Sequence, residues 1–191
     1  LEITDQIQAV IQSLRTNPWS RRHLVSAWNV ADLPDELNTP QENVLNGKQA
    51  LAPCHVMFQF YVEEMTLLER IAHFNRDPDN VGIRMGVNAD TVTADQMDLL
   101  DRLLVPTMSL SCQVYMRSVD VPVGLPFNIA SYALLTQLMA NECGMSLGRL
   151  VMSLGDAHIY HDQIPMVEDM LTRTPNPSPR LHLHTSTNIT N

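Results

Sequence analysis

Apolar residues spaced three and four apart predict four helices along the chain. The first begins at Thr4, a residue type that caps helix N-termini, and ends before Asn17-Pro18. Its apolar face is expected to hold Ile3, Ile7, Val10, Ile11 and Leu14. The other three helices are expected over residues 64–74, 94–104 and 126–138.

Near-continuous apolar and aromatic runs predict buried strands between these helices. We expect strands at 54–62, 110–116 and 150–154, and an alternating strand at 181–184 after the proline-rich linker 175–179. Residues 31–50 are rich in Pro, Asn, Gln and Asp, which predicts an irregular surface loop. The fold class that follows is α+β, a large mixed β-sheet covered by helices. We expect one domain over residues 1–191, with 63–107 as a helical insertion between two core strands.

The chain of 191 residues has a formal charge of -9 and a pI near 5.1. Such a balance argues against a broad nucleic-acid or anionic-membrane surface, and no apolar run is long enough to span a bilayer. The three cysteines are odd in number and form no CxxC pair, which argues against a disulfide scaffold and a Cys-based zinc site. We expect a cytoplasmic protein that uses no metal and requires neither membrane nor nucleic acid.

Cys54 is the first candidate for chemistry because it follows Pro53 at the start of a strand and precedes His55. A cysteine becomes a strong nucleophile when a nearby cation favours its thiolate. The alternative is a buried structural cysteine, which is the commoner role for a free thiol.

Two arginine-containing pairs could form a phosphate site. Arg21 and Arg22 share one loop, and Arg117-Ser118 end a strand. Guanidinium groups bind phosphate oxygens in bidentate fashion, and a serine hydroxyl adds a donor. The alternative is a set of surface salt bridges with the abundant acids.

Polar residues in two later segments could bind the rest of a nucleotide. Asn128 offers the donor and acceptor that match a pyrimidine imide edge, although an Asn near a helix start is also a common N-cap. His158 and Tyr160 alternate along an extended segment and could share a sugar hydroxyl or simply pack in a core. His182 and His184 lack a third ligand, so a half-exposed strand explains them better than a metal site.

These segments together resemble thymidylate synthase. Four motifs carry the resemblance in the family's order: residues 20–29 (SRRHLVSAWN), 51–62 (LAPCHVMFQFYV), 117–135 (from RSVD to GLPFNIASYALL) and 155–160 (GDAHIY). The resemblance implies reductive methylation of dUMP to dTMP, with 5,10-methylenetetrahydrofolate as the donor of carbon and hydride. It also implies a homodimer that forms through one face of the sheet.

The resemblance also assigns roles to single residues. Cys54 matches the nucleophile that attacks pyrimidine C6, with His55 beside it supporting ordered water. The resemblance implies that Arg117 and Ser118 of one chain bind the substrate phosphate, together with Arg21 and Arg22 of the partner chain. Three further contacts are implied: Asn128 to the uracil edge, His158 and Tyr160 to the deoxyribose hydroxyl, and Asp120 to the folate pterin.

The sequence departs from the family pattern in ways that keep alternatives open. An upstream segment with a proton-handling glutamate and a closing C-terminal segment are absent from these 191 residues, so we expect a chain incomplete at both ends. Met116 replaces the usual glutamine before Arg117, as in phage dCMP hydroxymethylases, which favours a phage-encoded member. The alternatives are a dUMP or, less favoured by Asn128, a dCMP hydroxymethylase, and an inactive fragment that serves as a binding module.

Overall fold

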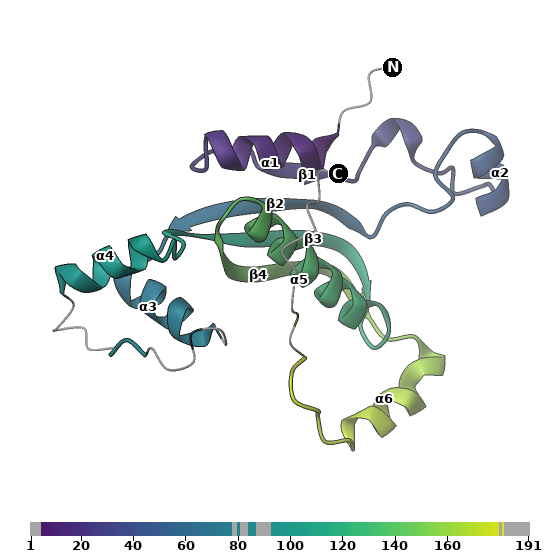
Figure 1. Cartoon of the computed structure of the whole chain (residues 1–191). Helices are drawn as coiled ribbons and strands as arrows, with labels where there is room; N and C mark the ends of the chain where they lie inside the picture. The colour runs from purple at the N-terminus through teal and green to yellow at the C-terminus, as the bar shows by residue number, and fades with distance from the viewer. Residues whose placement is uncertain (1–4, 78–79, 81–83, 87–92, 180, 182–191) are drawn as a thin grey trace.

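The computed structural model describes residues 5–77, 80, 84–86, 93–179 and 181. Its centre is a mixed sheet of four strands in the order β1-β2-β3-β4 (Figure 1). The β1–β2 and β2–β3 pairs are antiparallel, whereas β3 and β4 are parallel and are joined by helix α5. The strands are β1 Leu24–Ser26, β2 His55–Glu64, β3 Met108–Asp120 and β4 Ser146–His158.

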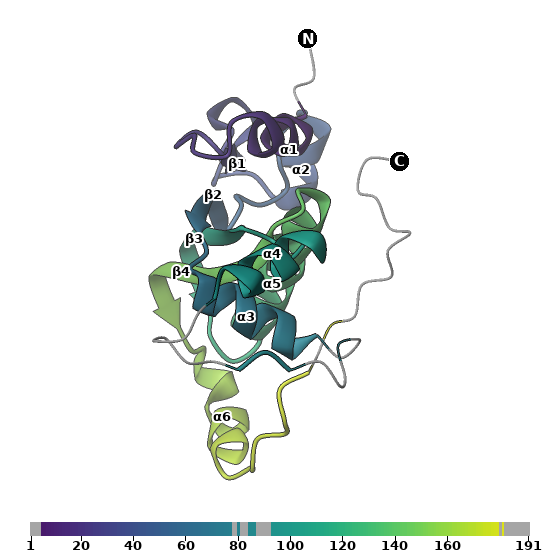
Figure 2. The same cartoon turned by 60° about the vertical axis from the view of Figure 1, so that its left-hand side comes forward.

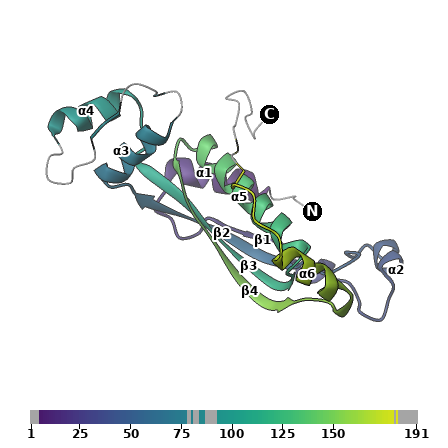
Figure 3. The ribbon, with the colours of Figure 1, turned by 90° about the horizontal axis from the view of Figure 1, so that it is seen from below.

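Helices α1 (Gln6–Thr16) and α5 (Gly124–Glu142) cover the same face of the sheet (Figure 3). Alternate residues of each strand point to this face, because successive side chains along a strand point to opposite sides. The resulting core contains Val10, Ile11 and Leu14 of α1 and Tyr132, Met139 and Ala140 of α5, packed on Phe58, Phe60, Leu110, Cys112 and Val114. The predicted α+β class, with a mixed sheet packed against helices, is confirmed.

The segment between β2 and β3 forms a helical hairpin with a core of its own. Helices α3 (Leu67–Arg76) and α4 (Ala94–Arg102) lie beyond one end of the sheet, and Figure 2 turns them toward the viewer. Each begins with a capping box in which a threonine side chain and a Glu or Gln side chain exchange hydrogen bonds with the backbone. Their shared cluster consists of Ile71, Phe74, Met85, Leu100 and Val105.

Several element boundaries differ from those predicted. Helix α1 is capped by Asp5, whose carboxylate accepts from the Gln8 N–H, and Thr4 lies outside the described residues, as does the predicted strand 181–184 apart from Leu181. The predicted loop 31–50 contains a short helix, α2 (Pro40–Leu45), with a capping box between Thr39 and Glu42. Helix α6 (Ile164–Leu171) was not predicted. Helix α5 and strands β3 and β4 all extend further than their apolar runs.

The face of the sheet opposite α1 and α5 carries exposed apolar side chains. Tyr61 is 55% exposed between buried Phe60 and Val62, and Tyr115 is 43% exposed between buried Val114 and Met116. Leu24 on β1 and Val151 on β4 are exposed on the same face, since they pair in register with these strands. No helix among the described residues covers this face.

Strands β3 and β4 approach each other very closely at Gly155. Every second residue of β3 from Leu110 to Met116 is buried. The next buried residue is Val119, three positions after Met116, so the alternation of buried and exposed residues shifts by one position at Arg117. Opposite this point, a Cβ atom on Gly155 would lie 2.6 Å from the Arg117 carbonyl oxygen. Only glycine therefore fits here without moving backbone atoms, and the shape of this strand end depends on it.

We expect Gly155→Ala to lower the free energy of unfolding by about 1–3 kcal/mol, because the new methyl group must push against the β3 backbone. The measurement is the urea midpoint at one fixed protein concentration. Gly86→Ala is the control, since nothing lies within 4 Å of its Cβ position. Equal midpoints for the two variants would contradict the steric argument.

Candidate active site

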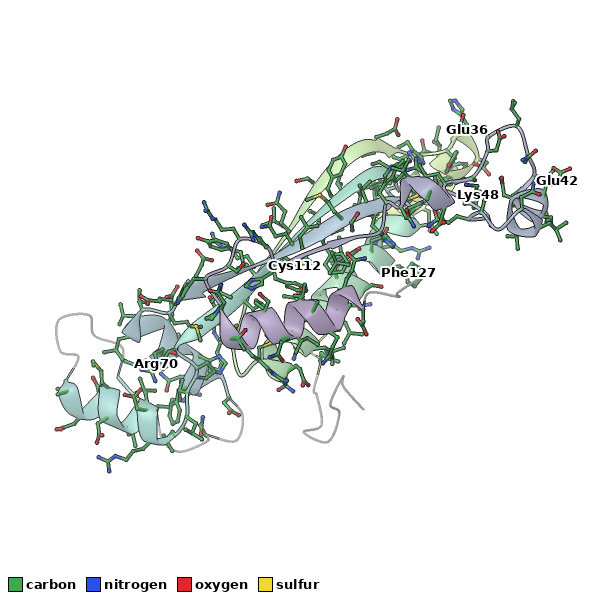
Figure 4. All side chains as sticks on the ribbon, turned by 90° about the horizontal axis from the view of Figure 1, so that it is seen from above. Glu36, Glu42, Lys48, Arg70, Cys112 and Phe127 are labelled. Atoms are coloured by element: carbon green, nitrogen blue, oxygen red, sulfur yellow. The ribbon has the colours of Figure 1, made fainter. Side chains whose placement is uncertain are left out.

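Most of the predicted site residues come together at one end of the sheet. Cys54 precedes β2, Arg117, Ser118 and Asp120 end β3, and His158 ends β4. Because β2 runs antiparallel to β3 and β4, its start meets their ends, and helix α5 also begins there. Figure 4 shows Phe127 of α5 and the loop labelled at Glu36 and Lys48 toward this end, with Arg70 at the other.

Cys54 is the exposed member of the three cysteines. Cys112 is buried in the core under the sheet, where desolvation raises the pKa of its thiol to about 11. Burial likewise raises the pKa of Cys143. Both of these thiols stay protonated near neutral pH and are poor nucleophiles. The alternative reading of Cys54 as a buried structural cysteine is wrong.

Arg117 holds the residues that lead into Cys54. Its Nε donates to the Pro53 carbonyl at 2.9 Å and its Nη2 to the Ala52 carbonyl at 3.0 Å. Its backbone N–H donates to the Cys54 carbonyl at 2.8 Å, and its guanidinium lies 5.8 Å from the centre of the Trp28 ring. The planar fork of an arginine suits such paired acceptors. Arg117 therefore fixes the backbone that leads into Cys54.

Asp120 is held through both carboxylate oxygens. Oδ1 accepts from the Val123 N–H at 3.2 Å, at the start of α5, and Oδ2 accepts from Nε2 of Gln163 at 3.0 Å. Ser118 is half-buried beside it and pairs in register with Asp156 on β4. Asp120 is thus oriented by two elements before any ligand is bound.

His158 and Tyr160 lie side by side, as their alternation predicts. Their ring centres are 4.8 Å apart in an edge-to-face arrangement. Nδ1 of His158 is hydrogen-bonded to Asp156 at 2.8 Å, which directs Nε2 away from that carboxylate. Tyr160 is 55% exposed, so the reading of these two residues as a packed core pair does not hold.

Asn128 lies in the second turn of α5 and does not cap the helix. The cap position is Val123, five residues earlier, which removes the N-cap explanation for this amide. Asn128 is half-buried beside Gly124, where a Cβ atom would lie 3.7 Å from its Oδ1. His55 is exposed at the start of β2, with its ring 5.9 Å from that of Tyr132.

Arg21 and Arg22 do not join this cluster within one chain. The Arg21 carbonyl accepts from Nε2 of Gln59 at 3.1 Å, which places the loop beside the middle of β2. Gln59 is five residues from Cys54, or about 16 Å along an extended strand. Both arginine side chains are exposed, and neither has an ion-pair partner among the described residues. Within one chain the loop of Arg21 and Arg22 therefore lies away from Cys54, and the phosphate site stays a prediction.

A cavity of about 370 Å³ lies next to the Cys54 loop. Its lining includes Trp28, Leu51 and Ala52, the last of which accepts a hydrogen bond from Arg117. A larger depression, about 480 Å³, lies at the other end of the sheet between α3 and the start of β4. That depression contains none of the predicted site residues, so its size does not identify it as the reaction site.

Sequence reasoning missed two residues that organise this end of the sheet. Trp28 lies against Arg117, although its sequence neighbours give no sign of this contact. Gln163 was not singled out, and its pairing with Asp120 spans 43 residues, so no local pattern could have revealed it. Among the described residues, no group of three or more His, Cys, Asp or Glu side chains is placed to hold a metal ion. None of the described helices is long and apolar enough to cross a membrane.

Comparison with protein-family models gives a match to thymidylate synthase over residues 2–191. The match spans both the strands that carry the site and the hairpin between β2 and β3. The chain belongs to the thymidylate synthase family, whose members are one-carbon transferases that methylate or hydroxymethylate dUMP.

Proposed function

We propose that this protein converts dUMP to dTMP by reductive methylation through a covalent adduct between Cys54 and C6 of the pyrimidine. The observation that carries the proposal is the fixed, exposed position of Cys54 at the sheet end, held by Arg117. The co-substrate 5,10-methylenetetrahydrofolate would supply both the carbon and the hydride. The protein is then a methyltransferase that acts in nucleotide biosynthesis.

In the proposed reaction Cys54 adds to C6 and makes C5 nucleophilic, so that C5 takes up the one-carbon unit. Loss of the C5 proton and release of the folate from the one-carbon unit leave an exocyclic methylene on the pyrimidine, which is still bound to Cys54. Hydride from the released tetrahydrofolate then reduces this methylene to the methyl group of dTMP as the thiolate leaves C6, and dihydrofolate is the second product. Arg117 would bind the phosphate together with Ser118. Because Nε and Nη2 of Arg117 already hold the Cys54 loop, phosphate binding and cysteine positioning would share one side chain.

Other residues at this end of the sheet would recognise the base and the sugar. Asn128 would accept from uracil N3–H and donate to O4, a pattern that cytosine reverses. His158 and Tyr160 would bind the deoxyribose hydroxyl through Nε2 and the phenol, and His55 would support ordered water beside the cysteine. Asp120, already oriented by Val123 and Gln163, would contact the folate pterin.

The active form in this proposal is a homodimer that buries the open sheet face. Exposed Leu24, Tyr61, Tyr115 and Val151 supply the apolar surface that such an interface requires. Arg21 lies beside Gln59 on this face, away from Cys54 of its own chain. A two-fold interface would carry Arg21 and Arg22 to the partner's phosphate site, which would explain why both side chains are exposed.

We expect the full-length protein to form a covalent ternary complex with 5-fluoro-dUMP and methylenetetrahydrofolate through Cys54. Fluorine at C5 cannot leave as a proton, so the adduct stays trapped and adds the mass of both ligands. Intact mass spectrometry reads this out. Cys54→Ala should abolish the adduct, whereas Cys143→Ala should keep it.

Absence of the adduct, or an adduct that survives Cys54→Ala, would refute the assignment. With dUMP as substrate, the product mass then distinguishes the final step. dTMP supports hydride transfer, and hydroxymethyl-dUMP would replace the proposed activity with that of a hydroxymethylase.

We expect the partner arginines to be essential and to act across the dimer. Arg21→Ala/Arg22→Ala and Cys54→Ala should each be nearly inactive alone. Mixing them with subunit exchange should restore about a quarter of wild-type activity, because half of the dimers are mixed and each has one complete site. Subunit exchange is verified by native mass spectrometry. Lack of recovery in verified mixed dimers would assign these arginines to their own chain or to the surface.

A further inference from the structure

The side chain of Gln163 joins two residues that the proposed function assigns to different ligands. Its Oε1 accepts from the backbone N–H of Tyr160 at 3.1 Å, and its Nε2 donates to Oδ2 of Asp120 at 3.0 Å. Gln163 ends the short 3-10 turn His161–Gln163 that follows β4, and it is half-buried. One amide therefore connects the end of β4 with the end of β3.

The orientation of this amide is fixed by its partners. A backbone N–H can only donate and a carboxylate can only accept, so the oxygen must face Tyr160 and the nitrogen must face Asp120. Asp120 in turn accepts from Val123 through its other oxygen, and the Val121 N–H donates to the His158 carbonyl at 3.0 Å. The Asp120 carboxylate and the segment 158–160 are thus tied together as one unit.

We propose that Gln163 is a positioning residue that couples the nucleotide site to the folate site. It does so by holding the Asp120 carboxylate in a fixed position relative to Tyr160. The inference rests on the proposed function, in which Tyr160 binds the deoxyribose and Asp120 binds the pterin. A nucleotide that fixes Tyr160 then also fixes the carboxylate that receives the folate. Each carboxylate oxygen keeps a second acceptor position for the ligand.

A purely structural role for Gln163 would be to cap its own turn. Gln96 at the start of α4 provides the matched comparison, since its Oε1 accepts from the Thr93 N–H at 3.1 Å, the same contact to a backbone N–H three residues earlier. Gln96 lies in the hairpin beyond the far end of the sheet. Substitutions that disturb only a cap should therefore act alike at the two positions.

Three variants separate positioning from capping. Gln163→Met removes both hydrogen bonds and should raise the KM for methylenetetrahydrofolate about tenfold, while the Kd for dUMP alone stays within about twofold. Gln163→Glu keeps the acceptor for Tyr160 but places a carboxyl group against Asp120. Gln96→Glu makes the same chemical change away from the site and should leave both constants at wild-type values.

The pH dependence of the folate KM in Gln163→Glu separates a positioning role from a capping role. Two adjacent carboxyl groups share one proton at low pH and repel each other once both are ionised. The folate KM of this variant should be close to that of wild type near pH 5 and rise as pH increases toward about 7. The other titratable side chains close to Gln163 in the sequence are Asp156, His158, Tyr160, His161 and Asp162. They are the same in wild type and Gln96→Glu, whose profiles provide the baseline.

Three outcomes distinguish failure of this inference from failure of the proposed function. If wild type forms the covalent ternary complex but Gln163→Met and Gln163→Glu keep wild-type folate KM values at every pH, the positioning role is wrong and the proposed activity stands. Equal losses of kcat and stability in the Gln163 and Gln96 variants would likewise show that Gln163 only caps its own turn. If wild type forms no ternary complex, the proposed function itself has failed.

Discussion

The site depends above all on the hydrogen bonds between the Arg117 guanidinium and the carbonyls of Pro53 and Ala52. Cys54 precedes β2 in an exposed position, and a residue there has no strand partner of its own. Arg117 supplies the missing constraint with two side-chain bonds and a third from its backbone N–H to the Cys54 carbonyl. Hydrogen bonds to a charged donor are stronger than neutral ones, and half-burial protects them from water.

The shape of β3 makes this arrangement possible. Regular alternation would place Arg117 on the open face of the sheet, opposite the core residues Val114 and Met116. At Arg117 the alternation shifts, and Gly155 on β4 allows the two backbones to approach closely. Asp120, three residues further on, then contacts the start of α5 and the turn after β4. The ends of β3 and β4, the start of α5 and the Cys54 segment thus lie at the same end of the sheet.

The sequence predicted the parts of the fold in which a periodic apolar pattern decides the structure. The helix over 94–104 begins after Thr93 as expected, and the strand over 54–62 is β2 within two residues. Strands β3 and β4 extend further than predicted because Ser, Arg, Gly and Asp interrupt their apolar runs while the ladder continues. Helix α2 was missed, although Thr39-Pro40 followed by Glu42 is a capping signal, because the surrounding composition is typical of a loop.

The site was predictable as a set of residue types but not as a geometry. Cys54, Asn128 and His158 were singled out, yet the exposed position of the first and the non-capping position of the second needed the structure. The separation of Arg21 from Cys54 depends on the pairing register of β1 and β2, which a sequence does not specify. The contact from Arg117 to Pro53 spans 64 residues and therefore has no local signature.

Hydrogen–deuterium exchange in Arg117→Lys tests most directly whether Arg117 positions Cys54. Lysine keeps the charge but lacks the fork that reaches two carbonyls. If the account is correct, peptides covering 115–119 and 50–56 should exchange at least about tenfold faster than in wild type, because the local opening free energy falls. Peptides from the core of β3 (110–114) and from β2 (58–64) should be unchanged. Wild-type protection at 115–119 and 50–56 in this variant would contradict the account.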